Sequence, residues 1–200
     1  MSRDPARAAS QFFGGRVCLD FANTLDWRLT DSPVELIPDF AALLAWSERR
    51  GILPTRALTK LRQHGGESSA REVIHVAHWL RTQIWSIAED LIAGRRARLG
   101  TLNDHLAELP SQPGLRVHHS RYVFELDGSE PQQTLWPVLW SLTAVLVSED
   151  AGRLGTCQGQ GCGWYFVDES PNRSRTWCSS EVCGNRERVR RAYARRRAKS

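Results

Sequence analysis

The sequence predicts a mainly α-helical protein, with a helical N-terminal domain that carries a small β-hairpin insertion and a small C-terminal module that ends in a basic helix. Two observations predict the helical domain, residues 11–151: apolar residues recur at helical spacing along most of it, and a stretch near residue 120 alternates at two-residue spacing. The third observation is that paired cysteines and arginines gather in residues 152–200. We expect residues 1–10, which are small and polar without periodicity, to form a disordered tail.

Charge is distributed unevenly along the 200 residues, of which 41% are hydrophobic. Residues 151–200 hold 11 Lys and Arg against 4 Asp and Glu, a net charge of +7, whereas residues 1–150 hold 16 against 18, a net charge of −2. This asymmetry indicates a polyanionic partner at one end of the chain. Because there is no run of 18 apolar residues and no apolar stretch typical of a signal peptide, we expect no membrane span and a cytoplasmic location.

The helical domain opens with polar residues beside an apolar stripe. Four apolar residues are spaced for one face of a helix: Leu19, Phe21, Ala22 and Leu25. Asp20, Asn23 and Asp26 recur at three-residue spacing and would share the adjacent face, with Arg28 nearby. They can cap helices or pair with Arg28 and other arginines, line a ligand pocket, or act as a catalytic carboxylate pair. No nucleophile, metal triad or glycine-rich phosphate loop accompanies them, so we expect no enzyme activity.

Prolines and glycines delimit the next two helices. We expect Pro38 to be the first residue of a helix with Asp39 in its first turn, because proline suits that position and an acidic charge is favourable there. The helix should stop at Gly51. A second, short helix is expected to follow Pro54 and to run to residues 65–66, which are both glycine.

A capping box, Ser69-x-x-Glu72, predicts the start of the clearest helix, which Gly94 should end. Its apolar positions follow a repeat close to 3.6 residues: Val73, Val76, Ala77, Leu80, Ile84, Ile87, Ala88 and Leu91. Thr101-x-x-Asp104 predicts a further short helix.

Alternation then predicts the β-hairpin, with apolar residues at two-residue spacing: Leu115, Val117, Tyr122, Phe124 and Leu126. We expect Asp127 and Gly128 to form its turn. The last helix of the domain should begin between Pro131 and Pro137 and end near residues 149–150.

Four of the five cysteines occur as two Cys-x4-Cys pairs: Cys157, Cys162, Cys178 and Cys183. Thiolates are preferred ligands of structural zinc, so the pairs predict one closed four-cysteine Zn²⁺ site, with Cys183 in the first turn of the last helix. Nearby Arg173, Arg175 and Arg186 can offset the charge of the thiolates. Two disulfides are the alternative interpretation, but a cytosolic chain with paired cysteines more often binds metal.

The rest of the module resembles a treble clef, in which a knuckle, a hairpin and a helix surround one zinc ion. Strand-forming residues 164–167 predict one strand, residues 175–177 its partner, and three aromatic residues a small core: Trp164, Phe166 and Trp177. Such a small module needs the metal in order to fold.

The final helix is expected from Gly184 to Arg197, and its polar residues are candidate contacts to nucleic acid: Asn185, Arg186, Arg188, Arg190, Arg191, Arg195, Arg196 and Arg197. We expect most of these arginines to contact phosphates, and Asn185 and Arg188 to contact bases. Val189, Ala192 and Tyr193 are left to face the cysteine knuckle.

These motifs resemble the CGNR zinc-finger family of bacterial proteins over residues 154–197, which include Cys-x4-Cys-x-Trp-x-Phe and Cys183-Gly-Asn-Arg186. Residues 18–28 resemble the start of the ABATE domain, which that family pairs with the finger and which is described as a stress-induced transcription regulator. The resemblance implies a zinc-dependent, DNA-binding regulator of transcription. We expect its N-terminal domain to sense a small-molecule effector or to mediate a homodimer. An RNA- or ribosome-associated zinc module, an enzymatic or small-molecule-binding N-terminal domain and a protein adaptor remain alternatives.

Overall fold

The computed structural model describes residues 11–64, 67–108, 115–118, 121–124 and 126–198. The tail predicted at residues 1–10 lies outside this part of the chain. The helical domain contains the elements α2 (Val17–Ala22), β1 (Leu25–Asp26), β2 (Val34–Glu35), α3 (Phe40–Arg50), α4 (Thr55–His64), α5 (Glu67–Ile92), α6 (Gly100–Glu108), β3 (Leu115–His118), β4 (Arg121–Phe124) and α7 (Trp136–Leu146). A 3-10 segment, Pro131–Leu135, precedes α7.

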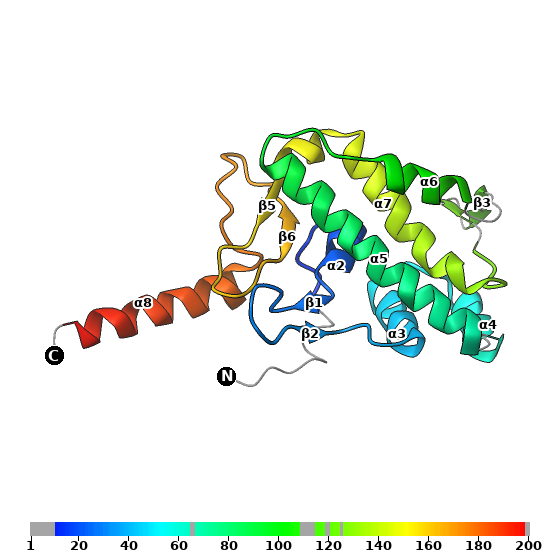
Figure 1. The fold of residues 1–200 in the computed structure, drawn as a ribbon, viewed down its shortest axis with the longest axis horizontal. Helices are drawn as coiled ribbons and strands as arrows, with labels where there is room; N and C mark the ends of the chain where they lie inside the picture. Colours follow the sequence, from blue (N-terminus) through cyan, green and yellow to red (C-terminus); the bar gives the residue numbers. More distant parts are fainter. Residues whose placement is uncertain (1–10, 65–66, 109–114, 119–120, 125, 199–200) are drawn as a thin grey trace.

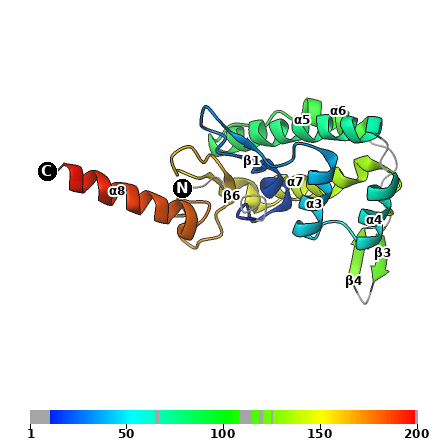
Figure 2. The same cartoon turned by 90° about the horizontal axis from the view of Figure 1, so that it is seen from below.

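The C-terminal module begins with a second 3-10 segment, Glu149–Arg153, and continues through β5 (Leu154–Thr156) and β6 (Tyr165–Val167) to a π-helical turn, Ser180–Gly184, and α8 (Asn185–Arg197). The protein is therefore mainly helical with small two-stranded hairpins, as the sequence predicts. Figures 1 and 2 show α8 projecting from the rest of the molecule at the end opposite α4 and the β3–β4 hairpin. None of the helices in the described residues is long and apolar enough to cross a membrane.

The main core forms where the short helix α2 packs against both α5 and α7. Six residues of the predicted stripe of α5 are buried: Val73, Ala77, Leu80, Ile84, Ile87 and Ala88. Phe21 of α2 and Trp46 of α3 meet edge to face in the same core, with 5.6 Å between ring centroids. The core continues into the C-terminal module, because Tyr165 and Val167 of β6 belong to the same buried cluster.

Several helix ends differ from the prediction by a few residues. Asp39 is the N-cap of α3, and its Oδ1 accepts a hydrogen bond from the Ala42 amide at 2.8 Å, so α3 starts at Phe40 rather than at Pro38. Gly51 ends α3 in the left-handed conformation, as predicted. The long helix α5 begins at Glu67, so the expected capping box at Ser69 lies inside it. The last helix ends at Leu146, earlier than expected.

The β3–β4 hairpin confirms the predicted strands, with Leu115 opposite Phe124 and His118 opposite Arg121. The predicted turn is wrong, because the connection lies between His118 and Arg121. Asp127 instead accepts hydrogen bonds from Ser129 and Gln133. These bonds lower the pKa of Asp127 to about 2, and the bond from the Ser129 amide has the largest effect. Asp127 thus fixes the loop that leads into the 3-10 segment before α7.

The strand pairing of the C-terminal module also corrects a prediction. Strand β6 pairs antiparallel with β5, which precedes the first cysteine, and not with residues 175–177. Residues 175–177 form a loop instead, and the Arg175 guanidinium donates to the carbonyl oxygens of Val167 and Cys178.

Candidate metal centre and basic helix

The Sγ atoms of Cys157, Cys162, Cys178 and Cys183 all lie within 4.8 Å of one another, and all four residues are buried. Two of the separations are 3.9 Å (Cys162 to Cys178) and 3.4 Å (Cys178 to Cys183). A tetrahedral zinc ion with Zn–S bonds of about 2.3 Å requires its sulfurs to lie about 3.8 Å apart. A disulfide would require about 2.05 Å. The cluster therefore fits one structural zinc site, and the disulfide alternative does not fit.

Glycines shape the first cysteine pair into a knuckle. Gly161 and Gly163 have φ angles of 76° and 70°, in the region that favours glycine. Gly159 lies so close to the sulfurs that a Cβ there would be 3.2 Å from Cys183 Sγ, and its amide lies 3.4 Å from Cys157 Sγ. The knuckle closes with a hydrogen bond from the Cys162 amide to the Gly159 carbonyl at 2.9 Å.

The second pair is delivered by the turn that leads into α8. Ser179 caps this turn by accepting a hydrogen bond from the Val182 amide at 3.2 Å. Cys183 lies in the π-helical turn, directly before α8 rather than in its first turn as predicted. Four thiolates around Zn²⁺ carry a net charge of about −2. Arg186 offsets part of it, because its Nη2 lies 3.2 Å from Cys183 Sγ.

Arg175 stabilises the module in a way that the sequence did not reveal. Its guanidinium donates to backbone carbonyls rather than to sulfur, including those of Phe13 at 2.7 Å and Cys178 at 2.6 Å.

Burial raises the pKa of Asp168, but hydrogen bonds from Ser170 and from the Arg175 amide outweigh that effect, and the pKa of Asp168 is lowered. Trp164 and Phe166 are buried beside the cysteines and Trp177 is partly buried, which confirms the predicted aromatic core.

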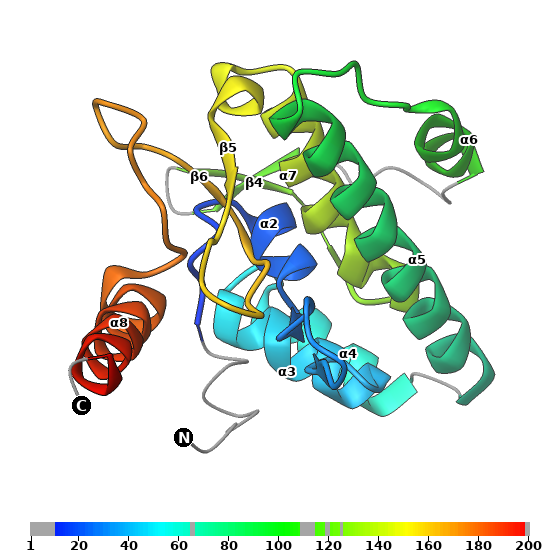
Figure 3. The same ribbon diagram turned by 60° about the vertical axis from the view of Figure 1, so that its left-hand side comes forward.

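A loop of the helical domain packs against the knuckle. The Leu29 amide donates to the Gly161 carbonyl at 3.3 Å, and a Cβ on Gly161 would lie 2.5 Å from Thr30. Arg186 lies over the ring of Trp27, with 4.3 Å between Cζ and the ring centroid. Figure 3 shows the resulting arrangement, with the β1–β2 region close to the cysteine module.

The four candidate pocket residues do not share one helix face, because α2 ends at Ala22 and Asp26 lies in β1. Asp20 accepts hydrogen bonds from the Gly14 amide and from Arg50 Nε, both at 2.8 Å. Asp26 accepts one from the Trp27 amide at 2.9 Å. Asp20 therefore binds a backbone amide and an arginine, and Asp26 binds a backbone amide. These are the local bonds and the arginine pairing that the sequence offers as one interpretation of these residues.

Asn23 and Arg28 connect the helical domain to β6. The Asn23 side chain donates to the Tyr165 carbonyl at 2.9 Å and accepts from the Tyr165 amide at 2.8 Å, as a paired strand would. Arg28 lies between the rings of Trp85 and Tyr165, at 5.0 and 4.9 Å from their centroids. It also donates to the Tyr165 hydroxyl at 2.7 Å, and that hydroxyl donates to Glu89 at 2.8 Å.

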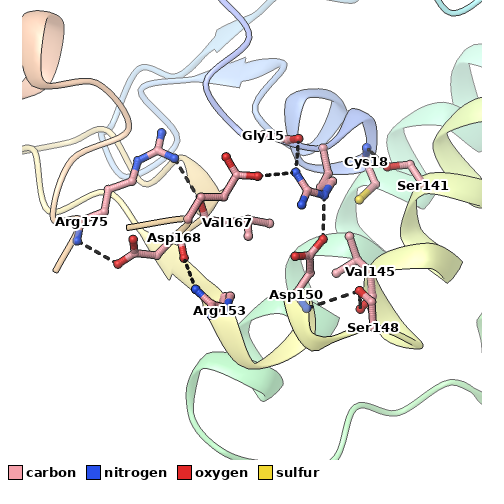
Figure 4. A network of polar contacts seen from close by, with 12 residues as sticks. Gly15, Cys18, Ser141, Val145, Ser148, Asp150, Arg153, Val167, Asp168 and Arg175 are labelled. Carbon is pink, nitrogen blue, oxygen red and sulfur yellow. Dashed lines mark hydrogen bonds and ion pairs between the residues drawn. The ribbon is translucent and has the colours of Figure 1, made fainter. Parts of the chain in front are cut away.

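A second link, shown in Figure 4, crosses the junction near residue 150. Arg16 Nε lies 2.6 Å from Asp150 and Arg16 Nη1 lies 2.8 Å from Glu169. The Asp168 amide donates to the Arg153 carbonyl at 2.7 Å. The two parts of the chain are therefore joined by polar contacts as well as by a shared core.

Helix α8 contacts the module through a residue that was not predicted. Glu187 is buried, and its Oε1 accepts a hydrogen bond from the Gln160 amide of the knuckle at 3.0 Å. Its other oxygen pairs with Arg190 at 2.6 Å. Both contacts lower the pKa of Glu187, and the hydrogen bond from the Gln160 amide has the larger effect. The prediction that Val189 and Tyr193 face the knuckle is wrong, because 53% and 67% of their surfaces are exposed.

All of the predicted nucleic-acid contacts except the half-buried Arg186 are exposed on α8. Arg186, Arg188 and Arg190 each bond within the protein, to Cys183, the Ser180 carbonyl and Glu187 respectively. A helix this basic and exposed is suited to an anionic partner.

Two family models match the chain. Residues 15–149 match ABATE, described as "Putative stress-induced transcription regulator", and residues 153–196 match the CGNR zinc finger. No curated protein matches the chain significantly. The four clustered cysteines all lie within the second match. The chain therefore belongs to the ABATE family and carries a CGNR zinc finger at its C-terminal end.

Proposed function

We propose that this protein binds duplex DNA through α8 and regulates transcription, and that it acts by binding rather than by catalysis. The observation that supports the proposal best is the exposure of α8, a helix of 13 residues that carries seven arginines and projects from a four-cysteine site. Exposed arginine side chains can approach DNA phosphates, and neutralising those phosphates releases the counterions bound to the DNA. The family description points to the same function.

The zinc ion has a structural rather than a catalytic role in the proposed function. All four cysteines are buried and leave no ligand position for a substrate. When bound, the ion would hold the knuckle, the turn before α8 and hence the base of the helix in one arrangement. Glu187 and Arg186 then fix how α8 leaves the module.

The test compares the binding of wild-type protein to duplex DNA and to structured RNA over a range of salt concentrations. We expect log K to fall with log salt at a slope of about −0.9 for each phosphate that is neutralised. A triple variant, Arg191→Gln, Arg195→Gln and Arg197→Gln, should bind DNA at least tenfold more weakly. The matched control removes three exposed arginines of the helical domain, Arg49, Arg71 and Arg96, and should bind like wild type.

A flat salt dependence, or equal weakening in the control, contradicts the proposal. Stronger binding to RNA than to duplex DNA would assign the protein to the RNA-associated class. Sedimentation of the full chain across a concentration series tests the further prediction that residues 11–151 mediate a homodimer. A small-molecule effector bound by these residues would raise the melting temperature of the full chain.

A further inference from the structure

The exposed apolar side chains of α8 need an explanation. Val189 and Tyr193 lie one helical turn apart on α8. Apart from these two residues and the buried Glu187, the helix consists of arginine, alanine and asparagine. Large apolar side chains on an exposed face often mark a binding surface. Neither faces the knuckle, which α8 contacts through Glu187 instead.

Helical spacing places these side chains on a distinct face. Asn185, Val189, Ala192 and Arg196 are separated by four, three and four residues, so they share one side of α8, with Tyr193 at its edge. Glu187, which is two residues from Asn185, lies on the opposite side and points at the protein. The four residues, which we call the outer face, therefore point away from the molecule.

Arginines flank the outer face on both sides. One flank carries Arg188, Arg191 and Arg195, and the other carries Arg190 and Arg197. Arg190 pairs with Glu187 but keeps 56% of its side chain exposed. A narrow face of asparagine, small apolar groups and one arginine between two cationic rows matches a groove lined by two phosphate backbones.

We propose that the outer face lies in the major groove of B-form DNA and reads the base sequence there, an inference that rests on the proposed function. The major groove is about 12 Å wide and admits a helix with its side chains. Asn185 can make two hydrogen bonds with adenine, Val189 and Ala192 can contact thymine methyl groups, and Arg196 can make two hydrogen bonds with guanine.

The geometry gives an approximate length for the site. Eleven residues separate Asn185 from Arg196, about 16 Å along the helix axis at about 1.5 Å per residue. At about 3.4 Å per base pair, these two readers lie at most about five base pairs apart, a limit that is reached when α8 is parallel to the DNA axis. The proposed site therefore holds an A·T pair and a G·C pair no more than about five positions apart, with thymines between them.

Other occupants fit the outer face less well. A second copy of α8 would bring arginine rows against arginine rows. The apolar strip is too narrow for a membrane surface. The major groove of A-form RNA is deep and narrow, so side chains on a helix cannot read bases there. Duplex DNA accounts for both the cations and the apolar centre.

The experiment selects preferred duplexes from a randomised library with the full-length, zinc-loaded protein, and then measures affinity for the selected and the scrambled sequence. Asn185→Ala should lower the preference by about tenfold or more at one A·T position, and Arg196→Gln should do so at one G·C position. Arg191→Gln serves as the control and should weaken binding to all sequences alike and reduce the salt slope by about 1. Unchanged melting temperature and zinc content would show that each variant folds.

The outcomes separate this inference from the proposed function. Strong, salt-dependent binding without any preferred sequence would overturn base reading and leave DNA binding intact. A preferred sequence that Asn185→Ala and Arg196→Gln bind with unchanged preference would also overturn it. No binding to any duplex would refute the proposed function, and the inference with it.

Discussion

The guanidinium of Arg186 lies 4.3 Å from the ring centroid of Trp27, while its Nη2 lies 3.2 Å from Cys183 Sγ. The first contact reaches a loop of the helical domain and the second reaches a metal ligand. One residue of the basic helix therefore joins the proposed DNA-binding element, the zinc site and the helical domain.

Replacing Trp27 with alanine should weaken zinc binding. The substitution removes a cation–π contact of about 0.5–2 kcal/mol, which corresponds to an affinity loss of about 2- to 30-fold. Competition with a chromogenic chelator measures the affinity. Tyr193→Ala removes an exposed aromatic side chain from α8 and should leave zinc affinity unchanged. Equal zinc affinities for Trp27→Ala and wild type would show that the Trp27 contact does not support the site.

Removing zinc should destabilise the helical domain as well as the finger. Tyr165 and Val167 lie in the main core, whereas Phe166 between them packs with the cysteines. Loss of the metal should therefore disturb β6 on both of its faces. Amide hydrogen exchange with and without chelator measures this, with faster exchange expected in β6 and in α5, and recovery when zinc is added back. Unchanged protection of α5 would show that the two parts fold independently.

Asn23→Ala should cost about 2–4 kcal/mol of unfolding free energy, because it leaves the buried amide and carbonyl of Tyr165 without partners. Urea denaturation measures the loss. Asp31→Ala, at an exposed position, is the control and should change stability by less than about 0.5 kcal/mol. A loss for Asn23→Ala as small as that of the control contradicts the structural role assigned to this side chain.

Cys18 should make stability depend on alkaline pH. Its thiol is fully buried, and burial raises its pKa from 9.0 to about 11. A raised pKa in the folded state means that the stabilising contribution is present below pH 9 and is lost as the pH rises to 11. The loss amounts to about 3 kcal/mol. The measurement is the unfolding free energy of wild type minus that of Cys18→Ala, between pH 8 and pH 11.5. A difference that stays constant over this range would contradict the assignment.

The sequence predicted the elements whose signals are local. The stripe of α5, the stop at Gly51 and the paired cysteines each depend on spacing within one segment, and each is confirmed. Helix starts were less accurate, because Ser69 and Asp39 have side chains that suit both a cap and a first turn. The choice between them depends on neighbouring contacts.

The errors arose where distant segments meet. Asn23 bonds to Tyr165, 142 residues later, and periodicity carries no information on such a pair. In α8, apolar residues were expected to face the protein, but the buried residue is Glu187, because the knuckle presents an amide rather than an apolar surface. Its pairing with Arg190 at three-residue spacing was the signal that could have identified it.

The most direct test of zinc-dependent DNA binding combines metal analysis with DNA-binding measurements for wild type and for Cys178→Ser. We predict one zinc ion per wild-type chain, salt-dependent binding to duplex DNA, and the loss of both zinc and DNA binding in the variant. A wild-type chain that is folded without metal, or a variant that binds DNA as tightly as wild type, would contradict zinc-dependent DNA binding.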